Sequence, residues 1–204
     1  MSRSHGRLVV AGLLLAIAAS NCTGSGDATS EGTETTGATP GAVTGPLCDM
    51  LPMGTDPGGP ATLTSKPADE ALQWIPVLTI FEAGARAARL AGDLRDTDEV
   101  TILAPTDDAF TSTFSQKTLD ELLLFREGEL RRLLEAHMID EALSLTELLE
   151  AGSVTTLAGD SLEITPAGNM ARLDDRAETV CADYRVGNAR IHVLDGVLGD
   201  LPRP

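Results

Sequence analysis

The sequence has 204 residues, of which 42% are hydrophobic, so it can bury the core of one domain or of two small ones. Aromatic residues make up only 3%, and we therefore expect a core built from Leu, Val, Ile and Ala. The formal charge of −16 at pH 7 repels phosphate backbones and anionic lipid head groups, which argues against a nucleic-acid partner.

Residues 1–22 have the features of an export signal. The basic residues Arg3 and Arg7 come first, an apolar run from Leu8 to Ala18 follows, and small residues end the segment. The apolar run is shorter than the roughly 20 residues that a transmembrane helix needs. Removal of Arg3 and Arg7 would change the formal charge from −16 to −18. The pattern predicts an extracytoplasmic protein.

Two cleavage sites compete at the end of this signal. The small-x-small pattern of Ala16 to Ala18 is that of an ordinary secretory signal, which would release a soluble chain. The segment Ala19 to Cys22 resembles a bacterial lipobox, in which the Cys becomes the lipidated N-terminus. Ala19 stands there where Leu is usual, and Asn21 where Gly, Ala or Ser is usual.

The cysteine count favours the lipobox. An exported protein with three cysteines leaves one unpaired, and a free exposed thiol is a liability in an oxidising compartment. If Cys22 carries lipid, Cys48 and Cys181 remain as a natural pair. Residues 23–46 then form a Thr/Gly/Ser/Ala-rich linker without apolar periodicity, whose flexible span of about 27 Å would tether a domain to a membrane.

Ordered structure is expected from Leu47 onward. Residues 50–60 are rich in Gly and Pro and predict turns, after which Ser65 is placed to cap a helix that starts at Pro67. Residues 77–90 predict a second helix, because their apolar side chains recur at spacings of three and four. Both helices precede the first strand that the pattern indicates.

The segment Thr101–Phe110, T-I-L-A-P-T-D-D-A-F, predicts a buried strand followed by a helix. The strand is a short apolar run that Pro105 ends. Thr106 can cap the helix, and Asp107 and Asp108 place two carboxylates in its first turn, where the helix dipole favours negative charge. Two carboxylates can do acid–base work across a cleft, but consecutive residues of a helix point in different directions. We therefore expect capping rather than catalysis.

Later segments predict further helices and then a β-rich part. Residues 119–124 and 130–136 are leucine-rich and amphipathic, with acids and arginines on the solvent side. Beyond Ser153, short alternating runs separated by turn residues predict strands that pair as antiparallel hairpins, at residues 154–157, 162–165, 170–173 and 179–181.

A second motif, N-A-R-I-H-V-L-D-G-V-L, occupies Asn188–Leu198. Together with the first motif it resembles the two signature boxes of the fasciclin domain, A-P-T-(D/N)-x-A-F and N-(G/A)-x-(I/V)-(H/Y)-x-(I/L)-D-x-V-L. The resemblance covers residues 47–202, and the two boxes occur in the family's order. The matching residues are Ala104, Pro105, Thr106, Asp107, Ala109 and Phe110 in the first box, and Asn188, Ala189, Ile191, His192, Leu194, Asp195, Val197 and Leu198 in the second.

The resemblance implies a single α+β domain over residues 47–204, with helices packed against twisted antiparallel β-strands. A narrower likeness concerns its ends: Gly45–Cys48 and Val180–Cys181 resemble segments of the exported fasciclin-domain lipoproteins and antigens of mycobacteria, which join the N-terminal segment to the late sheet by one disulfide. This likeness implies a bond between Cys48 and Cys181.

His137 aligns with the His of the family's Tyr-His motif, but Ala136 replaces the Tyr. The integrin-binding role of that region in animal fasciclin domains is therefore not carried over to this chain. We expect His137 and Asp195 to be structural polar residues that connect the boxes. Buried His nitrogens need hydrogen-bond partners, which we expect from Thr106, Asp107 or Asn188.

No catalytic template fits the sequence. A zinc site would need closely spaced ligand pairs, which are missing among Cys48, His137, Cys181 and His192. The acidic residues 93–99 lack the spacing and the Gly of a calcium loop. We therefore expect no metal, no cofactor and no enzymatic activity.

By resemblance, the expected function is cell-surface adhesion or interaction with a surface, matrix or host protein. The protein would be a monomer, held at the membrane through an N-terminal lipid alone. The alternative is an extracytoplasmic carrier that binds a small apolar or lipid ligand in a groove between helices and sheet. An adhesin would show an apolar patch on its surface, whereas a carrier would bind a ligand.

Overall fold

The computed structural model describes residues 42–199. The predicted export signal, Cys22 and most of the predicted tether lie outside these residues, as does the segment 200–204. The helices are η1 (Cys48–Met50), α1 (Pro60–Leu63), α2 (Ala68–Ala71), η2 (Leu72–Trp74), α3 (Thr79–Ala87), α4 (Leu90–Asp96), α5 (Asp107–Thr113), α6 (Gln116–Phe125), α7 (Glu127–Glu135) and α8 (Leu145–Ala151). The strands are β1 (Val100–Pro105), β2 (Met138–Ile139), β3 (Ser153–Thr155), β4 (Ser161–Ala167), β5 (Met170–Leu173), β6 (Ala177–Arg185) and β7 (Ala189–Leu194).

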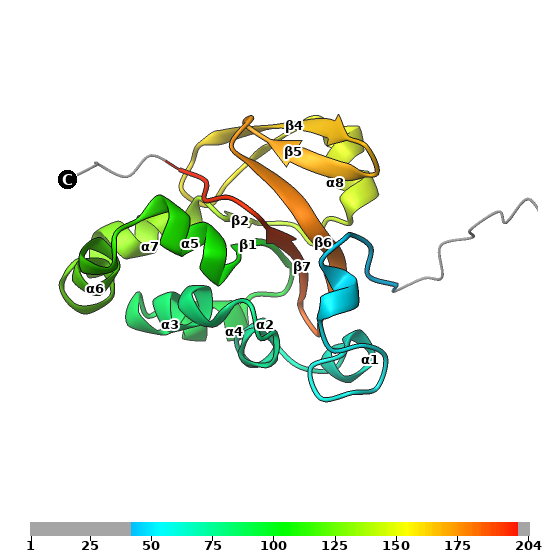
Figure 1. The fold of residues 1–204 in the computed structure, drawn as a ribbon, viewed down its shortest axis with the longest axis horizontal. Helices are drawn as coiled ribbons and strands as arrows, with labels where there is room; N and C mark the ends of the chain where they lie inside the picture. The colour runs from blue at the N-terminus through cyan, green and yellow to red at the C-terminus, as the bar shows by residue number, and fades with distance from the viewer. Residues whose placement is uncertain (1–41, 200–204) are drawn as a thin grey trace, which may run out of the picture. The chain divides into compact units, whose positions relative to one another are not determined.

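The strands form one seven-stranded sheet in the order β2-β1-β7-β6-β5-β4-β3 (Figure 1). Neighbouring strands are antiparallel, as predicted, except that β1 and β7 run parallel. The α+β class with helices packed on a sheet is confirmed, and the sheet itself is mixed. The parallel pair is possible because a long connection of helices and hairpins separates the two strands in the chain.

Strand β1 is buried along its whole length, which explains its continuous apolar sequence. Its alternating side chains enter two different cores. Ile102 and Ala104 belong to a core on the helical side, whereas Leu103 belongs to a core on the opposite side of the sheet. The strand predicted from residues 101–105 is therefore the layer that separates the two cores.

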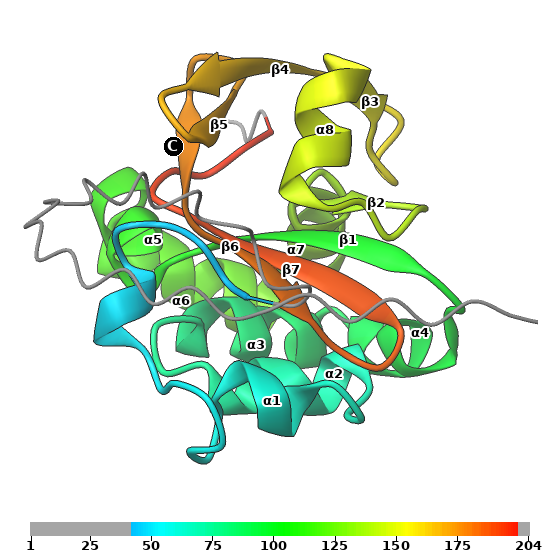
Figure 2. The ribbon, with the colours of Figure 1, turned by 90° about the vertical axis from the view of Figure 1, so that its right-hand side faces the viewer.

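The two cores lie on opposite faces of the sheet. Figure 2 shows α1 to α7 on one side of β1 and β7, and α8 with β3, β4 and β5 on the other. The larger core includes Leu72, Phe81, Phe110, Leu134, Tyr184 and Ile191. The smaller core includes Leu103, Leu148, Ile164, Leu173, Ala182 and Leu194. Most of these side chains are aliphatic, as the composition predicts.

Two helix predictions need correction. Ser65 does not cap the first helix, because Pro67 occupies the N-cap position and no side-chain cap bond forms there. The helix predicted over residues 77–90 is two helices, α3 and α4. The chain changes direction at Arg89, whose backbone has a left-handed conformation with φ of 58°, and this conformation interrupts the helical hydrogen bonding.

Candidate functional site

The two signature boxes lie side by side in the sheet. The parallel pairing of β1 with β7 places Ile102 opposite Ile191 and Leu103 opposite His192. Ala104, Ile191 and Leu198 are buried, with at most 1% of their surface exposed. The strand residues of the two boxes are thus brought together in the interior of the domain, whereas Asp195 at the end of the second box is exposed.

Helix α5 begins with the cap that the sequence predicts. The Thr106 hydroxyl accepts a hydrogen bond from the Ala109 backbone N–H at 3.1 Å. Asp107 also caps a different helix, since its carboxylate accepts bonds from the Thr79 hydroxyl at 2.6 Å and the Ile80 N–H at 2.7 Å. These groups belong to the first turn of α3, so Asp107 joins the two helix starts. The exposed Asp108 side chain takes no part in this network.

His137 is fully buried, and its partners differ from those predicted. Its Nε2 accepts a hydrogen bond from the Leu198 backbone N–H at 2.8 Å, so the ring proton is on Nδ1, which donates to the Leu133 carbonyl at 2.8 Å. Burial lowers the pKa of His137 from 6.5 to about 4, although the bond to Leu133 opposes the shift. The imidazole is therefore neutral and connects α7 to the end of the second box.

His192 is a second buried, neutral imidazole. Its Nδ1 accepts a bond from the Asp183 backbone N–H at 3.3 Å, and its Nε2 donates to the Leu143 carbonyl at 2.9 Å. Burial lowers the pKa of His192 as well. Both ring nitrogens are occupied by backbone groups, so this side chain joins β7 to the segment before α8.

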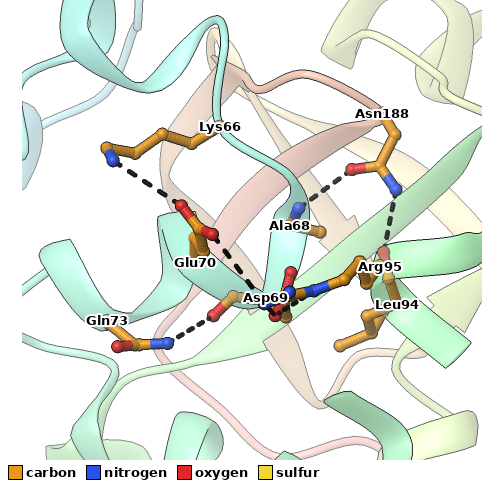
Figure 3. A network of polar contacts seen from close by, with 8 residues as sticks. All are labelled: Lys66, Ala68, Asp69, Glu70, Gln73, Leu94, Arg95 and Asn188. Carbon is orange, nitrogen blue, oxygen red and sulfur yellow. Dashed lines mark hydrogen bonds and ion pairs between the residues drawn. The ribbon is translucent and has the colours of Figure 1, made fainter. Parts of the chain in front are cut away.

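Asn188 connects the second box to two helices far away in the sequence. Its Oδ1 accepts a bond from the Ala68 N–H at 2.9 Å, and its Nδ2 donates to the carbonyls of Leu94 at 2.8 Å and Thr97 at 2.9 Å. Figure 3 shows the side chain between the start of α2 and the end of α4. It satisfies three backbone groups that these short helices leave unpaired.

Asp195 has a local role. One of its carboxylate oxygens accepts a bond from the Glu178 backbone N–H at 2.7 Å, and the Asp195 N–H donates to the Glu178 carbonyl at 3.1 Å. It therefore holds the chain beyond β7 against the start of β6. The partners predicted for His137 were wrong, because its actual partners are backbone groups.

Cys48 and Cys181 form a disulfide across a sequence separation of 133 residues. Both are buried, at 3% and 0% exposure. The bond fixes η1 to the middle of β6, and backbone hydrogen bonds between Thr44 and Ala182 run beside it. The N-terminal segment of the described chain is thus held against β6.

The surface contains apolar side chains that the sequence analysis did not single out. Leu124 and Phe125, at the end of α6, are 70% and 81% exposed, whereas Leu122 in the same helix is buried. The sequence indicates them by the apolar run Leu122 to Phe125. Four consecutive residues of a helix cannot all lie on one buried face, so some of them must be exposed. The pair is an exposed apolar protrusion on an acidic molecule.

Two cavities of about 470 Å³ open to the surface. One is an open, mainly apolar groove between the N-terminal segment and α5. It is lined by Pro46, Leu47, Ala109 and Val180, together with the polar residues Thr106, Asp108, Ser112 and Asp195. The other lies between α7 and β4 and has charged walls that include Arg132, Asp160, Asp174 and Arg176. Neither cavity contains His137, His192 or Asp107.

Within residues 42–199, no group of three or more His, Cys, Asp or Glu side chains is arranged to hold a metal ion. The same residues include no helix with the length and apolar character to span a bilayer. The signature side chains that the structure brings together therefore make hydrogen bonds and packing contacts that stabilise the fold.

The fold combines helices and one mixed sheet, and the comparisons with known proteins identify its family. The family model of the fasciclin domain matches residues 76–200, which is more than half of the chain, and the chain belongs to this family. The solved FAS1 domain pair of the insect cell adhesion molecule fasciclin I matches with a TM-score of 0.60. That match covers 67% of this chain and 52% of the other at 14% identity, so it supports the fold alone.

Two curated proteins are similar in sequence. Protein sll1483 of Synechocystis sp. is 29% identical over 117 residues, which cover 57% of this chain and 63% of that protein. Transforming growth factor-beta-induced protein ig-h3 of Sus scrofa is 29% identical over 118 residues, which cover 58% of this chain and 17% of ig-h3. The chain thus spans less than two thirds of either relative. The comparisons indicate no enzymatic family.

Proposed function

We propose that this chain is an exported surface protein that mediates adhesion by binding a surface, matrix or host protein. The observation that carries the proposal is the exposed pair Leu124 and Phe125, at 70% and 81% exposure. Exposed apolar patches mark interaction sites, and aromatic residues such as Phe are enriched in the cores of protein interfaces. The family and the adhesion molecule that shares the fold support the same function.

The electrostatic character of the domain restricts its partner. Most of its charged side chains are acidic, so a strongly acidic partner would be repelled and a neutral or basic one would associate faster. Binding of the purified chain to a panel of matrix proteins and intact cells tests the proposal. We expect saturable binding to at least one of them, and absence of binding throughout would contradict it.

We further propose that the chain is anchored at the membrane as a monomer. Residues 1–22 would be the export signal, Cys22 the lipidated residue, 23–46 the tether and 47–204 the adhesive domain. The support is the lipobox-like sequence, the pairing of the other two cysteines and the polar tether.

Replacement of the proposed lipidated cysteine tests the anchor. We expect Cys22→Ala to move the chain from the membrane fraction to the medium, because the lipid would be the only attachment. A Cys22→Ala chain that stays in the membrane fraction would contradict lipidation. Fractionation followed by immunoblotting measures the distribution, and Ser20→Ala, which keeps the cysteine, is the matched control.

The alternative function is that of an extracytoplasmic carrier for a small apolar or lipid ligand. The apolar groove of Pro46, Leu47, Ala109 and Val180 favours it, since its volume of about 470 Å³ is that of many small-molecule sites. A carrier purified from its native host would retain a ligand that native mass spectrometry detects. A mass equal to that of the polypeptide alone would count against this alternative.

A further inference from the structure

A third, smaller cavity lies on the helical side of the molecule, among α2, η2, α3 and α4. Its volume is about 220 Å³, below the about 300–1,000 Å³ of typical small-molecule sites. Leu72 and Leu94 provide apolar walls. The polar side chains that line it are Asp69, Gln73, Glu82, Arg86 and Arg95. The cavity is distant from the groove between the N-terminal segment and α5 and shares no lining residue with it.

Two of the lining carboxylates are unusually buried. The side chain of Asp69 is 8% exposed and that of Glu82 is 10% exposed. Each is paired with one arginine: Arg95 Nε donates to Asp69 Oδ2 at 3.0 Å, and Arg86 Nη2 donates to Glu82 Oε2 at 2.7 Å. Because both arginines are largely exposed, solvent screens these ion pairs and they contribute little net stability. Stability alone therefore does not account for two of them around one cavity.

The polar groups of the cavity have unused hydrogen-bonding capacity. Asp69 Oδ1 is buried and has no hydrogen-bond partner, and Glu82 uses only one of its two oxygens within residues 42–199. Gln73 donates to the Asp69 backbone carbonyl at 3.1 Å, which leaves its amide oxygen free (Figure 3). An unpaired buried acceptor such as Asp69 Oδ1 destabilises a protein, because it has lost its hydrogen bonds to water without replacement. The cavity therefore offers hydrogen-bond acceptors on Asp69, Glu82 and Gln73 as well as N–H donors on the two arginines.

We propose that this cavity binds a neutral, hydroxyl-rich ligand the size of one sugar ring. Its walls carry two carboxylates and two guanidinium groups, so a ligand of either charge would meet two like-charged groups. A hydroxyl group both donates and accepts, and it can therefore bond to carboxylate oxygens and to arginine N–H groups at the same time. The proposal deepens the proposed adhesive function, on which it rests, by assigning a ligand class to a second surface site.

Ligand entry requires a small movement of the cavity wall. Asp69 Oδ1 is shielded from solvent, whereas the side chains of Arg95 and Arg86 are 55% and 63% exposed. These exposed arginines can change rotamer without disturbing the core. A ligand hydroxyl would then donate to the Asp69 carboxylate beside Arg95 and complete its hydrogen bonding.

Ligand-observed NMR titration of the purified full chain tests the proposal. The probes are D-glucose, D-galactose, D-mannose and N-acetyl-D-glucosamine, together with the charged sugars D-glucosamine and D-glucuronic acid. We expect roughly millimolar, saturable binding of at least one neutral sugar. Gln73→Ala and Glu82→Gln should each weaken it by about tenfold, the effect of one lost hydrogen bond to a charged group or amide.

Glu150→Gln is the matched control, because Glu150 is an exposed acid on α8, outside the cavity, and its replacement should leave binding unchanged. Circular dichroism establishes that each variant is folded, and Gln73→Ala changes only an exposed side chain. Three results would overturn the proposal: no binding of any neutral sugar, binding that both cavity variants leave intact, or tighter binding of a charged sugar. The matrix and cell panel tests adhesion independently of this sugar titration.

Discussion

At position 137, a histidine that is fully enclosed by the core makes two hydrogen bonds that only its neutral form can make together. Protonation would require Nε2 to lose its bond from Leu198 while a charge is buried. Protonation of His192 would likewise break a hydrogen bond, because both of its ring nitrogens bind backbone groups. Both residues stabilise contacts between distant segments, which explains why a binding or metal-ligating role does not fit either.

The lowered pKa of His137 predicts the pH dependence of stability. The unfolded histidine titrates near 6.5 and the folded one near 4, so only the unfolded state gains a proton in this interval. Its stabilising contribution is complete above pH 6.5 and is lost as the pH falls to 4, by about 3 kcal/mol in total. Urea unfolding at pH 7.5 and pH 5 measures the loss.

In His137→Gln, the difference in unfolding free energy between these two pH values should shrink, because glutamine does not titrate. The two proteins differ at residue 137 alone, so the comparison isolates the histidine. An equal pH dependence in the variant and the unmodified chain would show that His137 is not the responsible group.

Asp107 and Asp108 are adjacent acids with different roles, and their replacement separates capping from any acid–base chemistry. Asp107→Ala removes two hydrogen bonds at the start of α3 and should lower the free energy of unfolding by about 1–3 kcal/mol. Asp108→Ala removes only an exposed charge near the helix start and should cost less than about 1 kcal/mol. Equal losses in thermal or urea unfolding would contradict the capping role.

At the scale of elements, the segment Thr101–Phe110 was predictable because its signals are local. A strand, a proline, an N-cap threonine and first-turn acids follow one another, and each determines the conformation of its own neighbours. The parallel pairing of β1 with β7 could not be predicted in this way, because the register depends on two segments far apart in the chain. The break at Arg89 was missed because a left-handed arginine has no distinctive sequence signal.

The polar contacts of the site were predictable only by residue type. Asn188 was singled out from its motif, but its partners belong to α2 and α4, and nothing in the sequence relates these helices to β7. The cavity residues Asp69 and Glu82 resemble ordinary surface acids of amphipathic helices until the packing of α2, α3 and α4 buries them. Side-chain partners across such distances follow from tertiary packing, which no local pattern encodes.

At the scale of the whole molecule, the disulfide holds the N-terminal segment on the sheet. Its reduction opens a loop closed over 133 residues, and the chain-entropy model gives a loss of about 5 kcal/mol as an upper estimate. We expect Cys181→Ala, combined with Cys48→Ala to avoid a free thiol, to lower the urea midpoint strongly. A midpoint within error of that of the unmodified chain would show that the bond contributes nothing to stability.

Residues 42–199 combine a buried structural centre with a surface that we propose to be used for recognition. The family signature lies at that centre, where it joins β1, β7, α3 and α7 by packing and hydrogen bonds. Unlike this buried centre, the surface is acidic, has an exposed apolar protrusion at Leu124 and Phe125, and contains separate cavities. We propose that this surface determines binding specificity. Most signature residues maintain the fold beneath it, and Thr106, Ala109 and Asp195 also line the apolar groove.

The most direct test of adhesion is the binding of a double variant, Leu124→Ser with Phe125→Ser, to the matrix protein or cell that the unmodified chain binds. Leu157→Ser, at an apolar residue with 45% exposure in the β3–β4 turn, is the matched control. Loss of two central apolar contacts should weaken binding at least about tenfold, whereas the control should bind normally. Unchanged binding by the folded double variant would contradict the account.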